Sequence, residues 1–199
     1  MKANDRNRAA KANGFSVVEL VIAVAIALVL SAIALPTMTS SIQAYRLSSA
    51  TRQVANVIDI ARFTAIRRNT LVSLQMIQQG PNTVFYVDAN GSGTLDLGET
   101  EVLLPSDMQR VNGQLLVPAA ATTGLANTVD FVNQITFDSR GTVSVSCGAG
   151  CILPATTNAF LAIGYANQVQ SGFRGISVNP MGLTRVWTSQ SRGGYWTAQ

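Results

Sequence analysis

Apolar residues are concentrated in one long segment near the N-terminus. From Phe15 to Leu35 the chain reads FSVVELVIAVAIALVLSAIAL, in which Glu19 is the single charged residue. As a helix this segment would be about 31 Å long, close to the thickness of a bilayer core. The pattern predicts a transmembrane helix over residues 15–36, preceded by a polar leader over residues 1–14.

The pattern then changes to one apolar stripe at helical spacing. Its members are Leu47, Ala50, Val54, Val57, Ile58, Ala61 and Ala65. This spacing predicts an amphipathic helix over residues 37–70. Pro36 lacks a backbone donor and is expected to kink or locally melt the helix.

Five arginines of this second segment fall largely off the stripe. They are Arg46, Arg52, Arg62, Arg67 and Arg68. Two interpretations stay open: a solvated basic face on a helix packed against a sheet, or an arginine-lined surface that binds a partner.

From residue 71 the chain shows short runs typical of β-strands, separated by Gly, Asn, Asp and Pro. The predicted strands are 71–77, 83–87, 101–104, 114–117, 131–137, 142–146, 160–166, 175–178 and 183–187. Residues 118–129 are predicted to form a loop. Because strands and helices do not alternate, antiparallel pairing is favoured. The predicted fold class is α+β: a long N-terminal helix, half transmembrane and half amphipathic, packed on an antiparallel β-sheet or sandwich head over residues 71–199.

Charge narrows the classes of function. Four of the 14 basic and one of the 10 acidic residues precede residue 15, so the rest of the chain has a net charge of +1. Overall basicity is therefore no argument for nucleic-acid binding. The sequence has no histidine, which excludes His-dependent catalysis and His metal ligation. No nucleophile or paired-carboxylate pattern is present either, so we expect no enzyme.

Two simpler interpretations of the apolar segment are a secretory signal and a plain membrane anchor. A secretory signal has an apolar core of about 7–15 residues closed by a small-residue cleavage site, and this run is longer. A plain membrane anchor leaves Glu19 unexplained, because a carboxylate inside an apolar helix costs about 2.5–3.5 kcal/mol. The basic leader predicts a cytoplasmic N-terminus and a head on the other side of the membrane.

The stretch GFSVVE at residues 14–19, followed by the apolar run and Pro36, resembles a type IV prepilin. The resemblance implies that a prepilin peptidase cuts between Gly14 and Phe15 and that the new N-terminus is N-methylated. In a filament, the Glu19 carboxylate of one subunit would meet the Phe15 amine of a neighbour, which compensates part of the cost of burying each charge. The pair would thereby set the register of subunits.

Two later stretches resemble minor pilins and pseudopilins of the GspH/FimT type: ANVIDIARFTAIRRNTLVSL at 55–74 and RGISVNPMGLTRVW at 174–187. The resemblance implies a low-copy subunit that helps to initiate or cap a type IV pilus. It also implies a single-pass inner-membrane protein with a periplasmic head. Its partners would be prepilin peptidase, other minor pilins and the major pilin. The alternatives are a minor pseudopilin of type II secretion and a DNA-binding minor pilin for transformation.

Residues 88–99 read DANGSGTLDLGE, which fits a twelve-residue calcium loop. The candidate ligands are Asp88, Asn90, Ser92, Thr94, Asp96 and Glu99. However, the loop follows a predicted strand rather than a helix, and Asn-Gly is a strong hairpin signal. Bound calcium and an ordinary polar turn are both consistent with the sequence.

Cys147 and Cys151 enclose Gly-Ala-Gly. Without another thiol or a histidine they cannot complete a structural zinc site. Outside the cytoplasm they are expected to form a disulfide, with free buried thiols as the alternative.

Some FimT-type members resemble DNA-uptake proteins with a Gly-Arg-x-Arg motif, and at that place this chain reads GLTR at 182–185. Leu183 stands where the first arginine would be. Arg185, aided by Arg174 and Arg192, would provide a weak and salt-sensitive phosphate contact. We therefore expect DNA not to be a main partner.

Overall fold

The structure is a computed structural model, and it describes residues 15–111, 128–131, 133–146, 152–153, 157–166, 172–190 and 195–199. The chain divides into two compact units, Met1–Thr39 and Ser40–Gln199. Helix α1 (Val17–Arg68) contributes residues to both units. It is continuous through residue 36, so the expected local melting at Pro36 is absent, and the kink stays a prediction.

Local backbone hydrogen bonds mark the start and the end of α1. At the start, the carbonyl of Ser16 accepts the N–H of Leu20 at 3.1 Å. At the end, Asn69 adopts a left-handed φ of 52°. The N–H of Thr70 then bonds the carbonyl of Ala65, and that of Asn69 bonds Ile66. These two hydrogen bonds form a Schellman cap, which turns the chain away from the helix axis.

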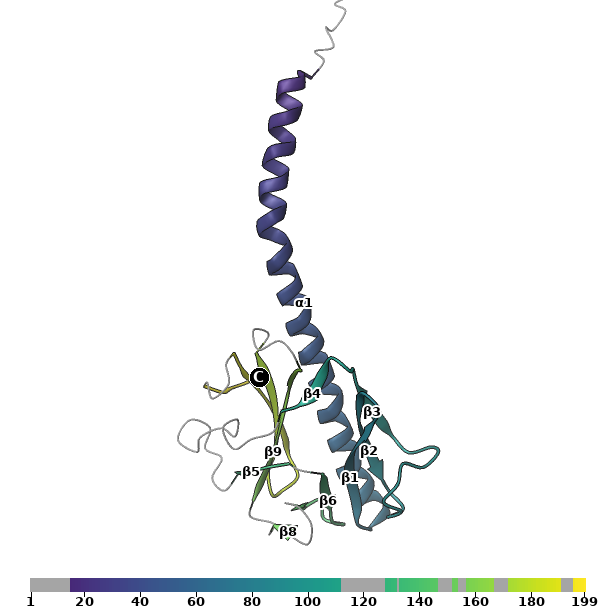
Figure 1. Cartoon of the computed structure of the whole chain (residues 1–199). Coiled ribbons are helices and arrows are strands. Elements are labelled where there is room, and N and C mark those ends of the chain that lie inside the picture. The colour runs from purple at the N-terminus through teal and green to yellow at the C-terminus, as the bar shows by residue number, and fades with distance from the viewer. Residues whose placement is uncertain are drawn as a thin grey trace, which may run out of the picture. The chain divides into compact units, whose positions relative to one another are not determined.

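The first sheet has the strand order β3-β2-β1-β6-β7-β8, with every neighbouring pair antiparallel (Figure 1). Its strands are β1 (Val72–Gln79), β2 (Asn82–Asp88), β3 (Glu101–Leu104), β6 (Gln134–Phe137), β7 (Val143–Ser146) and β8 (Ile152–Leu153). Strands β1 and β2 form a tight hairpin, and the loop from β2 to β3 is the predicted calcium loop.

The second sheet has the order β12-β11-β10-β9-β4, also antiparallel, with β5 added in parallel to β9. Its strands are β4 (Met108–Arg110), β5 (Thr128–Asp130), β9 (Asn158–Tyr165), β10 (Phe173–Val178), β11 (Thr184–Ser189) and β12 (Thr197–Ala198). Apart from β5, the sheet has the predicted pairing.

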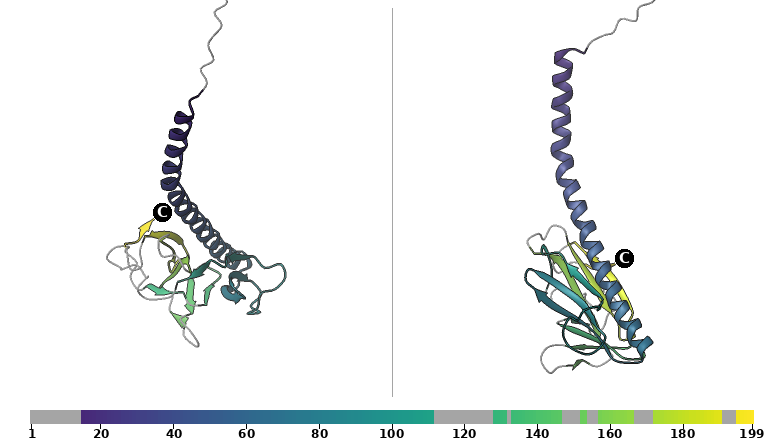
Figure 2. Two further views of the ribbon diagram at one scale, coloured as in Figure 1. Left: turned by 45° about the horizontal axis from the view of Figure 1, so that its top comes forward. Right: turned by 90° about the vertical axis from the view of Figure 1, so that its right-hand side faces the viewer.

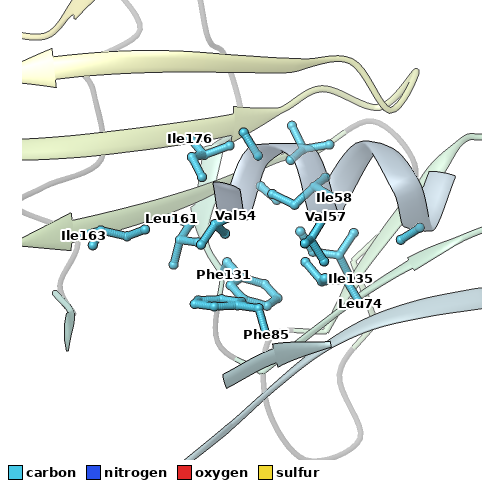
Figure 3. Packing of buried hydrophobic residues seen from close by; sticks show 14 of the residues in the cluster. Val54, Val57, Ile58, Leu74, Phe85, Phe131, Ile135, Leu161, Ile163 and Ile176 are labelled. Atoms are coloured by element: carbon cyan, nitrogen blue, oxygen red, sulfur yellow. The ribbon is translucent and has the colours of Figure 1, made fainter. Parts of the chain in front are cut away.

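The main core lies between α1 and the two sheets. All seven residues of the predicted apolar stripe are buried. Figure 3 shows Val54, Val57 and Ile58 of α1 facing side chains from both sheets. In the second unit, the part of α1 after residue 40 runs beside the strands (Figure 2). The predicted fold class, a long helix packed on an antiparallel β head, is confirmed.

A smaller cluster covers the other face of the second sheet. It consists of Val111, Phe160, Ala162, Phe173, Trp187 and Trp196. Successive residues of β9 alternate between this cluster and the main core, because side chains of a strand point to opposite faces in turn. Every residue of β9 is therefore buried.

Eight of the nine predicted strands coincide wholly or partly with observed strands, and the ninth, 114–117, lies outside the described residues. Strands β4, β5, β8 and β12 were not predicted. They are two or three residues long, too short to show periodicity. Thr128 and Val129 belong to β5 and correct the predicted loop over 118–129.

Candidate functional site

The N-terminal part of α1 carries a continuous apolar surface with one acid. Apolar side chains from Phe15 to Leu35 are exposed, with Phe15 at 79% and Leu35 at 64%. The length and hydropathy of this segment suffice to cross a membrane. Glu19 lies in the first turn of the helix and is exposed. A surface this apolar needs an apolar surrounding, such as lipid or other helices.

The predicted processing site lies at the edge of the described residues. Gly14 is outside them, and Phe15 is the first residue that the structure describes. Pro36 is helical, and its side chain is outside the described part. Cys147 and Cys151 also lie outside the described residues, so the disulfide stays a prediction.

The β2–β3 loop is organised around Asp88, which is 2% exposed. Its Oδ1 accepts the N–H groups of Gly91 at 2.7 Å and Ser92 at 3.1 Å. Its Oδ2 accepts the N–H of Gly93 at 2.9 Å and the side-chain amide of Gln75 at 2.8 Å. Four donors occupy the two oxygens, so in this conformation Asp88 acts as the internal acceptor of the loop.

The other candidate calcium ligands bond one another and the loop backbone. The side-chain amide of Asn90 donates to the Asp96 carboxylate at 2.8 Å. The hydroxyl oxygens of Ser92 and Thr94 are hydrogen-bonded at 3.3 Å. The two oxygens of Glu99 accept the N–H groups of Ala89 and Asp96. Hydrogen bonds from Asn90 and Ser92 lower the pKa of Asp96.

The structure thus brings all six candidate ligands into one loop. Within the described residues, however, no group of three His, Cys, Asp or Glu side chains is placed to hold a metal ion. In this conformation Asn90 donates to Asp96, and each oxygen of Glu99 accepts a backbone N–H of the loop. The calcium hypothesis stays a prediction.

The two arginines proposed to contact DNA lie on opposite faces of the second sheet. In the β10–β11 pairing Arg174 is opposite Thr188, whereas Arg185 is opposite Ser177. Arg174 shares its face with Ile176 and Val178 of the main core. Arg185 is exposed on the other face, where its guanidinium lies 5.1 Å from the Trp187 ring. The two side chains therefore cannot hold the same phosphate, and Arg192 lies outside the described residues.

Arg174 instead joins the sheet to α1. It is 8% exposed, and its Nε donates to Ser48 Oγ at 2.9 Å. A second link runs from Thr184 Oγ1 to the Asp59 carboxylate at 2.9 Å. Burial raises the pKa of Asp59, which outweighs the opposing hydrogen bond from Thr184 and charge of Arg62.

Sequence reasoning missed both of these links. The partners are separated by 126 and 125 residues along the chain, and no local pattern marks them. What the sequence did indicate was the helix face on which Ser48 and Asp59 stand, because both flank the apolar stripe.

Comparisons with known proteins show the family of the chain. The model of the family described as type II transport protein GspH matches residues 50–182, more than half of the chain. Two crystal forms of the type IV minor pilin FimU from Pseudomonas aeruginosa are similar in structure. They have TM-scores of 0.46 and 0.44 at 18% and 17% identity. Each comparison covers 73% of this chain and 93% or 98% of the FimU chain. A search of curated proteins finds no match.

Proposed function

Because the chain belongs to the family of the type II transport protein GspH, we propose that it is a minor pilin that helps to initiate or cap a type IV pilus. The proposal depends on one observation: a helix with an exposed apolar surface over residues 15–35 and a single acid, Glu19, precedes the family head. Such a helix suits storage in a membrane and later packing among similar helices in a filament.

The proposed life cycle has two stages. Prepilin peptidase first removes residues 1–14 on the cytoplasmic side, while the head lies in the periplasm and α1 crosses the inner membrane. The mature subunit then leaves the membrane and packs with other minor pilins and the major pilin. In both stages the role of the chain is structural, and no step needs catalysis by it.

A charge pair gives this assembly its register. Cleavage after Gly14 creates an α-amine on Phe15, four residues before the Glu19 carboxylate. Between neighbouring subunits the two charges can meet inside an apolar helix bundle. A subunit docked at another height leaves both charges buried and unpaired, which is strongly unfavourable.

The N-terminus of the mature protein tests the proposal. Mass spectrometry of protein extracted from membranes of cells with an active prepilin peptidase should show a chain that begins at N-methylated Phe15. The matched control is Gly14→Glu, which should remain unprocessed. A wild-type chain that still begins at Met1 would contradict the assignment as a pilin-like subunit.

The second candidate is a minor pseudopilin of the type II secretion system, which the description of the matching family favours. Both roles use the same N-terminal helix, so the phenotype of a deletion must separate them. Loss of surface pili with normal protein secretion supports the minor pilin. Loss of secretion of extracellular proteins with normal piliation supports the pseudopilin.

A further inference from the structure

Arg174 is a buried cation that has no acidic partner among the described residues. Its contacts are the Ser48 hydroxyl at 2.9 Å and the Phe173 carbonyl at 3.1 Å, both neutral acceptors. By contrast, the partly buried Arg110 of the second sheet has the Asp130 carboxylate at 2.9 Å. Burial lowers the pKa of Arg174, as expected for a desolvated charge that no carboxylate compensates.

The acidic side chains of the sequence are the candidates within the chain for a counterion to Arg174. No acidic side chain of the described residues forms an ion pair with it. The one acid of the sequence outside these residues is Asp5, which belongs to the leader. A buried guanidinium stays charged at any physiological pH, and an uncompensated buried charge is costly. A carboxylate that pairs with Arg174 would therefore have to come from another molecule.

Two open grooves lead to Arg174. The larger, of about 540 Å³, is lined along α1 by Tyr45, Ser48, Ser49, Arg52, Gln53 and Asn56. The smaller, of about 320 Å³, lies toward the start of the head, between Ser41 of α1 and Ser189 of β11. Neither groove has an acidic residue in its lining. An anionic group that enters either groove meets hydroxyl and amide donors and then the guanidinium.

We propose that the larger groove receives an aspartate or glutamate side chain from a neighbouring pilin-like subunit, which pairs with the buried guanidinium of Arg174. Arg52 is exposed and lines the same groove, so its positive charge attracts the carboxylate. This inference rests on the proposed function, because it requires another subunit against the head part of α1. It assigns to Arg52, one of the arginines off the apolar stripe, a role in binding a partner.

The geometry favours a protein carboxylate over nucleic acid. A carboxylate is planar, sits on a narrow side chain, and can accept two parallel bonds from one guanidinium. A nucleic-acid backbone needs several exposed cations along its path. Here one cation is recessed and one is exposed, so the groove fits one acidic side chain.

Site-specific cross-linking in cells that assemble the filament tests the site. A benzophenone amino acid replaces Gln53, an exposed residue of the groove, in the full-length chain. We expect a cross-link to another pilin-like subunit, at a peptide that contains Asp or Glu. Arg174→Met should lower the yield at least about tenfold, as for loss of a buried charge pair at an interface, and Arg52→Gln should lower it less. Arg67→Gln, exposed on the same helix outside both grooves, is the matched control and should leave the yield unchanged.

The acid on the partner is identified by a double-mutant cycle. Changing the cross-linked Asp or Glu to its amide should lower the yield as much as Arg174→Met does. The two substitutions together should lower the cross-link yield no more than either one alone, because both remove the same interaction. Additive losses, a cross-linked peptide without an acid, or a cross-link to nucleic acid would each overturn the proposal.

The thermal stability of Arg174→Met shows whether Arg174 serves to bind a partner or to stabilise the head. If Arg174 serves a partner, Arg174→Met removes an uncompensated buried charge, and the Tm of the detergent-solubilised chain should be unchanged or higher. A clearly lower Tm would show that Arg174 holds the head together and would overturn the proposal. A subunit that enters filaments normally but gives no Arg174-dependent cross-link would refute this site and leave the proposed function intact.

Discussion

Glu19 and Asp59 are two acids of α1 that the structure places in different situations. Glu19 is exposed on an apolar surface of the first unit and forms no ion pair with another described residue. Asp59 is half-buried in the head and accepts a hydrogen bond from Thr184. The first is expected to serve assembly, and the second to affect the stability of the head.

Replacing Glu19 by valine should separate insertion from assembly. Glu19→Val removes a charge that costs about 2.5–3.5 kcal/mol in a membrane, so insertion should be unchanged or improved. Incorporation into filaments should fall strongly, because the amine of Phe15 loses its partner. Membrane fractionation and immunoblots of sheared filaments measure the two effects. Ser31→Val, a substitution in the same segment, is the control, and normal incorporation of Glu19→Val would refute the register role.

The effect of Asp59→Asn on stability should depend on pH in a defined direction. The pKa of Asp59 is raised by burial above its usual value of 3.8. The ionised form is therefore penalised in the folded state at neutral pH, and this penalty disappears as the pH falls through the folded pKa toward 3.8.

The asparagine keeps an oxygen for the Thr184 hydroxyl and carries no charge. At pH 7 the Tm of Asp59→Asn should be unchanged or roughly 1–3 °C higher than wild type. The difference should shrink as the pH approaches 4. Thermal unfolding followed by circular dichroism between pH 4 and 7 measures it, and a difference that grows on acidification would contradict the assigned cause.

Among the elements, α1 packs on the sheets through small residues. Ala61 and Ala65 are completely buried in the main core, beside the larger Val54 and Ile58. Small side chains at these positions let the helix approach the strands closely. Core positions of this kind tolerate little extra volume.

Ala61→Leu should therefore destabilise the head by about 1–3 kcal/mol through overpacking. Gln53→Leu is the matched control, because Gln53 is exposed on the same helix and should change stability by less than about 0.5 kcal/mol. Urea unfolding monitored by tryptophan fluorescence gives both values. Equal effects of the two substitutions would show that the stripe is less closely packed than the structure indicates.

The β2–β3 loop makes the calcium hypothesis testable. If the loop binds calcium, millimolar calcium should raise the Tm above that in a chelator, because a ligand of the native state stabilises it. Asp96→Asn should remove the rise while changing the calcium-free Tm little. Asp88→Ala should lower the Tm in both conditions, because it removes the acceptor of three loop N–H groups and of the Gln75 side chain of β1. A Tm that does not respond to calcium would establish the loop as an ordinary polar turn.

The whole molecule divides at Thr39 and Ser40 into two compact units. The second unit contains both hydrophobic clusters and both sheets. The large apolar surface of residues 15–35 lies entirely in the first unit. A fragment that begins at Ser40 should therefore fold by itself.

We expect this fragment to be soluble and monomeric under oxidising conditions. Size-exclusion chromatography with light scattering and a cooperative thermal transition measure the two properties. A fragment that begins at Phe15 should need detergent. Aggregation of the Ser40 fragment would show that the head depends on the N-terminal part of α1 for folding or solubility.

Much of this architecture could be read from local patterns. The apolar run at 15–35, the stripe on α1 and the alternation of the longer strands predict helix and strand positions because side-chain direction repeats at 3.6 or 2 residues. The seven stripe residues are all buried as predicted. The loop at 88–99 is also local: turn residues and oxygen ligands follow one another within twelve positions. For such features, neighbouring residues carry the information.

The pairing of distant segments followed from no local pattern. Strand β6 joins β1 rather than its neighbour β5, and β5 lies parallel to β9, because the burial of whole faces decides which strands meet. The same holds for Arg174. From the sequence it was a candidate for DNA beside Arg185, yet strand register sends the two side chains to opposite faces. Its burial against Ser48 depends on helix and sheet packing across 126 residues. This packing, rather than any motif, leaves the guanidinium buried without an acidic partner in the described part of the chain.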